Sequence, residues 1–212
     1  MLRAPDPPAH SSQPHTSRGP PAIWLRQATD GGCCSSMHHR GMQKRVLVAY
    51  ASKHGSTREI AEVIAEQLSL HGLTAETASA ERVDSIEPYA AVVLGSAVYA
   101  NRWQAAATRF LKRHRDALGR RPLWIFTSGP LDPADDHDHT PARARRLAER
   151  AGAKGHATFG GRLSDEPTNF VERAMVRATP AEKRDARDWP AIRRWADEVA
   201  RELVTVPAPA GR

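Results

Sequence analysis

The stretch Arg45–Ala61 reads RVLVAYASKHGSTREIA, and the prediction of the fold starts from it. Its first six residues, RVLVAY, form a short apolar and β-branched run, which is typical of a buried parallel strand. After a polar loop, apolar residues recur at helical spacing, at Ile60, Val63, Ile64 and Leu68. Gly72 follows, and glycine is the residue that most often ends a helix. The stretch therefore predicts a strand, a loop and a helix in direct succession.

The same alternation of strand and helix continues to the end of the chain. Further strands are predicted at Leu73–Ser79, Ala90–Gly95, Leu123–Thr127 and Ala157–Gly160. Further helices are predicted at Ala105–Leu118, Ala142–Ala151 and Pro190–Leu203, with Asp188 as the cap of the last one. This order predicts an α/β three-layer sandwich, in which helices cover both faces of a five-stranded parallel sheet. The ligand of such a sheet lies beyond the carboxyl ends of its strands, so the loops there are the candidate site.

The loop Ser52–Thr57 has the features of a phosphate-binding loop. Backbone N–H groups at the start of a helix favour an anion, and Gly55 lets the chain approach it closely. Hydroxyl donors come from Ser52, Ser56 and Thr57. The motifs G-x-G-x-x-G and G-x-x-x-x-G-K-[ST] are both absent, so the loop suits a terminal monophosphate better than a pyrophosphate or a triphosphate. The alternative is a hydroxyl-capped helix that binds no ligand.

The segment Tyr50–Ala61 resembles the phosphate loop of the flavodoxin superfamily. It is most similar to the branch of menaquinone-dependent protoporphyrinogen dehydrogenases, in which a basic residue precedes an x-G-x-T-R segment. Val92–Tyr99 and Phe110–His114 also resemble that branch. The resemblance implies a flavodoxin-like fold with strand order 2-1-3-4-5 and FMN as a non-covalent cofactor. The chain departs from ordinary flavodoxins at His54, where they have threonine.

The resemblance also implies which residues hold FMN. The phosphate would be wrapped by Ser52, Lys53, His54, Gly55, Ser56 and Thr57. The isoalloxazine ring would be flanked by Ser96, Ala97, Val98, Tyr99 and the residues up to Trp103, and by Thr127, Ser128 and Gly129. Tyr99 and Trp103 are the candidate stacking partners, although Trp103 could instead pack on the sheet. No catalytic residue is predicted, because the chemistry of the flavin itself would carry the reaction.

Two functions agree with this resemblance. The first is an oxidoreductase that oxidises an organic substrate, such as protoporphyrinogen in heme biosynthesis, and passes electrons to a quinone such as menaquinone. The second is an electron carrier that serves a redox partner protein and has no small-molecule substrate. Carrier flavodoxins are strongly acidic, so the basic character of this chain favours the enzyme. Arg102 would favour it too if its side chain pointed at the flavin, and would contribute little if it turned to solvent.

Composition limits the other functional classes. The 212 residues are 40% hydrophobic and 26% charged, without a run of eighteen apolar residues or a secretory signal, so a cytoplasmic protein is expected. The stretch Leu163–Arg187 is only weakly apolar, which limits membrane contact to peripheral association. The net charge is +7, but no basic stripe with interleaved aromatic residues is present, and no nucleic-acid partner is expected. No metal site is expected either, since Asp135–His139 has the character of a solvated loop.

Residues 1–44 are predicted to be a disordered tail rich in proline, serine and histidine, and residues 206–212 a flexible end. An alternative is that translation starts at Met37 or Met42 and that the tail is an over-extended start. Both cysteines, Cys33 and Cys34, fall in this tail and cannot form a C-x-x-C site. The tail has five basic residues and two aspartates, so its net charge of +3 leaves +4 for the rest of the chain. Residues 45–205 are the predicted FMN-binding domain.

Overall fold

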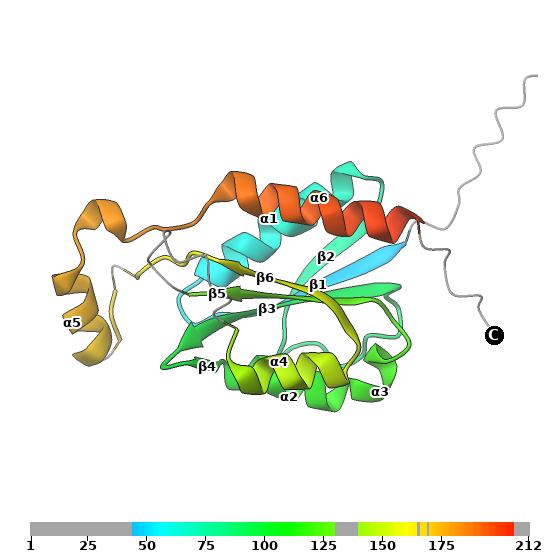
Figure 1. Cartoon of the computed structure of the whole chain (residues 1–212), viewed down its shortest axis with the longest axis horizontal. Coiled ribbons are helices and arrows are strands. Elements are labelled where there is room, and N and C mark those ends of the chain that lie inside the picture. Colours follow the sequence, from blue (N-terminus) through cyan, green and yellow to red (C-terminus); the bar gives the residue numbers. More distant parts are fainter. Residues whose placement is uncertain (1–43, 130–139, 165, 169, 206–212) are drawn as a thin grey trace, which may run out of the picture. The chain divides into compact units, whose positions relative to one another are not determined.

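A parallel β-sheet in the order β2-β1-β3-β5-β6 forms the centre of the fold (Figure 1). The computed structural model describes residues 44–129, 140–164, 166–168 and 170–205. The parallel strands are β1 Arg45–Ala51, β2 Thr74–Ser79, β3 Ala91–Tyr99, β5 Leu123–Ser128 and β6 Ala153–Phe159. This order, with β5 and β6 as the fourth and fifth parallel strands, confirms the predicted flavodoxin-like sandwich.

The central strands are buried on both faces, which explains their nearly continuous apolar sequences. Successive side chains of a strand point to opposite faces, so Val46 and Val48 pack on one side of β1 while Leu47 and Ala49 pack on the other. Gly95 of β3 leaves room for a neighbouring ring, because a Cβ atom there would lie 2.0 Å from Cζ of Phe126.

Two pairs of helices cover the sheet, one pair on each face. α1 (Ser56–Leu70) and α6 (Trp189–Thr205) lie on the upper face in Figure 1. α2 (Ala105–Arg113) and α4 (Ala142–Arg150) lie on the lower face, and the short α3 (Arg115–Leu118) follows α2. Gly72 follows α1 with a φ of 78°, and the Asp188 carboxylate accepts a hydrogen bond from the Ala191 amide at 2.9 Å. Both predicted helix boundaries are therefore confirmed.

The structure differs from the sequence prediction in three short elements. A two-residue strand, β4 (Arg102–Trp103), pairs antiparallel with the end of β3. The helix predicted over Ala105–Leu118 is interrupted at His114, whose ring is buried against Phe110 at 4.7 Å between centroids. β6 starts four residues earlier than predicted, because this edge strand alternates between partly buried and exposed residues and lacks an apolar run.

The largest difference lies between β6 and α6. This stretch forms α5 (Phe170–Ala178), the 3₁₀ turn Ala181–Lys183 and a backbone bridge between Arg162 and Asp185. Figure 1 shows α5 beyond the carboxyl-terminal end of the sheet, where the site is expected. Residues 1–43 of the predicted tail, with both cysteines, the acidic loop Asp135–His139 and the predicted flexible end 206–212 lie outside the described residues.

Candidate functional site

A cavity of about 390 Å³ opens at the carboxyl ends of β1, β3 and β5. The loop after β1, the end of β3 and the residues after β5 supply most of its wall. The remaining wall comes from Arg162, Leu163 and Ser164 and from three residues of α5, namely Glu172, Met175 and Val176. The cavity therefore lies where an open parallel sheet binds its ligand, and it combines hydroxyl groups with apolar side chains.

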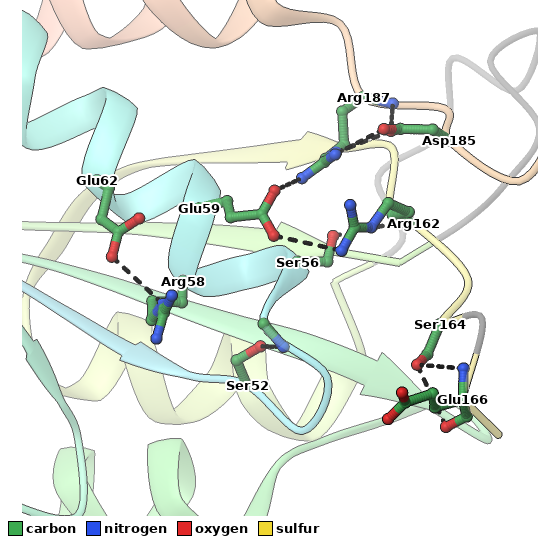
Figure 2. Close-up of polar contacts among 11 residues, drawn as sticks. Ser52, Ser56, Arg58, Glu59, Glu62, Arg162, Ser164, Glu166, Asp185 and Arg187 are labelled. Atoms are coloured by element: carbon green, nitrogen blue, oxygen red, sulfur yellow. Dashed lines mark hydrogen bonds and ion pairs between the residues drawn. The ribbon is translucent and has the colours of Figure 1, made fainter. Parts of the chain in front are cut away.

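The loop between β1 and α1 is shaped by one glycine and two serines. Gly55 stands immediately before α1 with a φ of 87°, a conformation that side chains rarely tolerate. Its amide donates a hydrogen bond to Ser52 Oγ at 3.0 Å, as Figure 2 shows. Ser56 Oγ accepts one from the Arg162 amide at 3.1 Å, which ties the loop to the stretch after β6. The N-terminus of the 15-residue helix α1 is thus presented to the cavity.

Thr57, the second residue of α1, holds the most informative polar atom of the site. Its side chain is fully buried, and it belongs to the cavity wall. Its hydroxyl oxygen has no hydrogen-bond partner among the residues that the structure describes. A buried hydroxyl without a hydrogen-bond partner is destabilising. Its presence at a helix N-terminus therefore indicates that a ligand oxygen accepts its hydrogen bond. A phosphate group fits this position.

Glu172 of α5 contacts the same loop from the opposite side. Its carboxylate accepts hydrogen bonds from Lys53 Nζ at 2.6 Å and from the amide of Thr168 at 2.8 Å, and it lies 3.1 Å from His54 Nε2. The Lys53 ammonium is the main cause that holds the pKa of this carboxyl well below its usual value. Glu172 is buried. Through its contacts with Lys53 and His54 it forms a charged link between α5 and the phosphate loop.

A second group of charges joins α1 to the chain that returns toward α6 (Figure 2). Glu59 contacts Arg187 at 2.5 Å and Arg162 at 3.4 Å. Arg187 also pairs with Asp185 at 2.6 Å, and this bond is the main cause of the lowered pKa of the Asp185 carboxyl. The network fixes the segment around the Arg162–Asp185 bridge against α1, and Arg162 also lines the cavity.

The opposite wall comes from the end of β3 and the turn into β4. Tyr99 is about 39% exposed at the cavity, and its ring centre lies 5.8 Å from Lys53 Nζ. The pKa of the Tyr99 phenol is raised, mainly because the side chain is partly buried. Ala100 and Asn101 follow with φ values of 47° and 56°, so the chain turns sharply there. Trp103 is buried behind this turn, where its indole N–H donates to Thr127 Oγ1 at 3.1 Å.

Most of the residues predicted from the sequence meet at this cavity. Nine of them line it: Ser52, His54, Ser56, Thr57, Ala97, Val98, Tyr99, Ser128 and Gly129. Lys53 and Gly55 lie in the same loop without lining the cavity. Ser96 and Thr127 lie behind the wall, where Ser96 Oγ accepts from the Gln104 amide and Thr127 Oγ1 pairs with Thr140 Oγ1. These two hydroxyls support the wall.

The structure places two arginines whose positions the sequence left undecided. Arg102 is exposed and lines a separate hollow between β4, α2 and α4. Arg162, which the sequence prediction overlooked, lies at the cavity instead. Glu172 and Met175 were also overlooked, because a short helix far along the chain carries no local mark of its contact with the β1–α1 loop. In the described part of the chain, no helix is long and apolar enough to cross a membrane, and no cluster of metal-ligating side chains is present.

Comparison with known proteins assigns the chain to a family. The family model described as "Flavodoxin domain" matches residues 47–189, and the chain belongs to this family. Flavodoxins use FMN, so this membership confirms the cofactor predicted from the sequence. The Thr57 hydroxyl and the glycine-shaped loop at the N-terminus of α1 fit its phosphate.

One group of relatives belongs to the branch that the sequence resembles. The protein named protoporphyrinogen IX dehydrogenase [quinone] from Escherichia coli K12 is 30% identical over 85 residues, which are 39% of this chain and 47% of the relative. The same values hold for the protein of that name from Escherichia coli O157:H7. The match thus spans about half the length of these curated relatives.

Solved structures share the fold at low sequence identity. A flavodoxin from the domain Archaea has a TM-score of 0.53 and 13% identity, over 76% of this chain and 99% of that one. Oxidised flavodoxin 1 from Bacillus cereus has a TM-score of 0.52 and 13% identity, over 77% of this chain and all of that one. At these identities the likeness concerns the fold alone.

Proposed function

We propose that this chain is an FMN-dependent oxidoreductase that holds the cofactor in the cavity at the carboxyl ends of β1, β3 and β5. The observation that carries the proposal is the buried and unpartnered hydroxyl of Thr57, at a helix N-terminus inside the cavity wall. FMN would supply the redox chemistry, by accepting two electrons from one partner and passing them to another. The protein would supply placement, charge and exclusion of water.

Each part of the site has a role in this proposal. The loop from Ser52 to Thr57 would hold the phosphate through hydroxyls, backbone amides and the dipole of α1. Lys53 would add positive charge on the same side, with Glu172 keeping the side chains of Lys53 and His54 in position. Tyr99 would stack on the flavin ring, and Ala97, Val98, Ser128 and Gly129 would line it.

Two observations favour an enzyme over a simple electron carrier. The wall formed by Leu163, Met175 and Val176 adds apolar surface opposite the end of β3, as a pocket for an organic substrate requires. The net charge of the chain without its tail is +4, whereas carrier flavodoxins are acidic. The partial match to protoporphyrinogen IX dehydrogenases makes protoporphyrinogen the first substrate to test, with menaquinone as acceptor. Peripheral membrane association and a cytoplasmic location stay predictions.

The experiment uses the full chain loaded with FMN. Under anaerobic conditions the protein is mixed with protoporphyrinogen and a soluble menaquinone analogue, and the fluorescence of protoporphyrin is followed. The enzyme function predicts porphyrin formation that requires both FMN and the quinone. Reduction of the bound flavin by a redox protein, without porphyrin formation at any quinone concentration, would favour the electron carrier instead.

A further inference from the structure

The face of the molecule formed by α2 and α4 is strongly basic. Together the two helices carry seven cationic side chains and one carboxylate, a net charge of +6. The opposite face differs, because α1 has one arginine against three glutamates and α6 has three arginines against three acids. The net charge there is −2. This asymmetry gives the domain a directed electric field, which steers charged partners toward one face.

Several cations of the basic face are not neutralised. Lys112, Arg143 and Arg146 are exposed and make no hydrogen bond or ion pair within the described residues. Among the described residues, Arg109 pairs with Glu81 at 3.1 Å, and both side chains are exposed. Structural cations on a helix surface usually pair with acids three or four residues away, but α2 has no acid and α4 has only Glu149 against four arginines. Within the part of the chain that the structure describes, this charge is therefore not paired.

The basic face also adjoins the proposed cofactor cavity. A hollow of about 300 Å³ lies between β4, α2 and α4, and its cationic lining consists of Arg102, Arg109, Lys112 and Arg143. Tyr99 and Ala100 line the cofactor cavity, and the next two residues, Asn101 and Arg102, line this hollow. The sharp turn between β3 and β4 therefore separates the two sites, so a partner seated on the hollow would lie beside the flavin.

The composition of the face indicates the chemistry of its partner. Neither α2 nor α4 exposes a large apolar side chain, so the face offers no anchor for a bilayer interior. Neither helix exposes an aromatic ring on which a nucleic-acid base could stack, because Phe110 is fully buried. Charge without apolar anchors is typical of small and short-lived electron-transfer interfaces.

We infer that the face formed by α2, α4 and the β3–β4 turn docks a small acidic electron-transfer protein. The inference rests on the proposed FMN function and names the partner that exchanges electrons with the flavin. When the partner reduces the flavin, each of two reduced partner molecules would give up one electron. Together with two protons from water, the two electrons would fully reduce one FMN. Complementary charge would steer an acidic partner toward this basic face and fix its orientation there.

The test uses a plant-type [2Fe–2S] ferredoxin as the acidic probe and the full chain loaded with FMN. Binding is measured by calorimetry at about 20 mM and about 500 mM salt, because screening separates charge-driven docking from other contacts. The variant K112E/R143E is compared with R194E/R201E on α6, which changes the net charge equally. We expect the first variant to weaken binding about tenfold or more at low salt and to slow flavin reduction by reduced ferredoxin. The α6 control should differ from wild type by less than about threefold.

Three results would overturn the inference. The wild type could fail to bind ferredoxin at low salt, both variants could weaken binding equally, or the face variant could lose binding only to anionic vesicles or RNA. The last result would identify a membrane or a nucleic acid as the partner. FMN titration of the flavin-free protein keeps the two proposals apart. Docking that persists in a protein unable to bind FMN would refute the cofactor assignment and leave the docking face in place, whereas FMN binding without docking would refute only the docking face.

Discussion

Replacing Thr57 by valine is predicted to have opposite effects on stability and on cofactor binding. The hydroxyl of Thr57 is fully buried and has no partner within the described residues, and valine has nearly the same shape. In the free protein the change removes a polar group that is neither hydrated nor hydrogen-bonded. In the FMN complex it removes a donor to the phosphate.

The magnitudes follow from these two environments. Leaving a buried polar group unsatisfied costs about 1–3 kcal/mol, so T57V should stabilise the free protein by about 1 kcal/mol after allowance for local relaxation. A hydrogen bond to a charged group contributes about 1.5–3 kcal/mol, and each 1.4 kcal/mol corresponds to a factor of ten. FMN binding should therefore weaken by about 10- to 150-fold.

The assay combines chemical unfolding of the flavin-free protein with fluorescence titration by FMN and by riboflavin. T57V should bind riboflavin as wild type does, because riboflavin has no phosphate. Thr108→Val on α2 is the matched control, since that hydroxyl donates to backbone carbonyls and lies outside the cavity. The control should leave both flavin affinities unchanged. A T57V protein that is less stable than wild type and retains its FMN affinity would refute this role for Thr57.

Three further predictions concern the parts around the site. Glu172→Gln should lower the free energy of unfolding by about 1 kcal/mol at pH 7, with the Lys53 contact discounted for its exposure. Because the folded-state pKa of Glu172 lies below its usual 4.5, this stabilisation is complete above that value and is lost in stronger acid. The gap between wild type and variant in acid unfolding should therefore begin to narrow below the usual pKa of 4.5 and keep narrowing as the pH falls further, and a pH-independent gap would contradict the ion pair. Gly95→Ala would place a Cβ 2.0 Å from the buried Phe126 ring and should cost about 1–3 kcal/mol in thermal unfolding, whereas an unchanged midpoint would mean that the ring moves freely. A shortened chain that starts at Met42 should keep the thermal midpoint and flavin content of the full chain, and a loss of several degrees would show that the tail packs on the domain.

The sequence predicted the parts of the fold that depend on local pattern. The run Arg45–Tyr50 is apolar because β1 is buried on both faces, and Gly55 follows it because the loop requires a positive φ. These features are local in the chain, so periodicity and single-residue preferences reveal them. The end of α1 at Gly72 and the cap at Asp188 are of the same kind.

The parts that escaped prediction depend on contacts between distant residues. Glu172 lies 119 positions from Lys53, and nothing in the sequence around either residue indicates that they meet. Arg162 reaches the cavity because a backbone bridge to Asp185 holds its segment against α1. Trp103 and Tyr99 were both candidate stacking partners, yet the indole of Trp103 is buried on Thr127 while Tyr99 lines the cavity. Only tertiary packing decides between two such residues.

The most direct test of the proposed function is the ratio of the affinities of the flavin-free protein for FMN and for riboflavin. The two ligands share the ring and the ribityl chain, so their ratio isolates the phosphate and the loop that should bind it. Several charge-assisted hydrogen bonds at the N-terminus of α1 predict that FMN binds about a hundredfold tighter or more. Equal affinity for the two ligands, or no binding of either, would contradict the assignment of Ser52–Thr57 as the phosphate site.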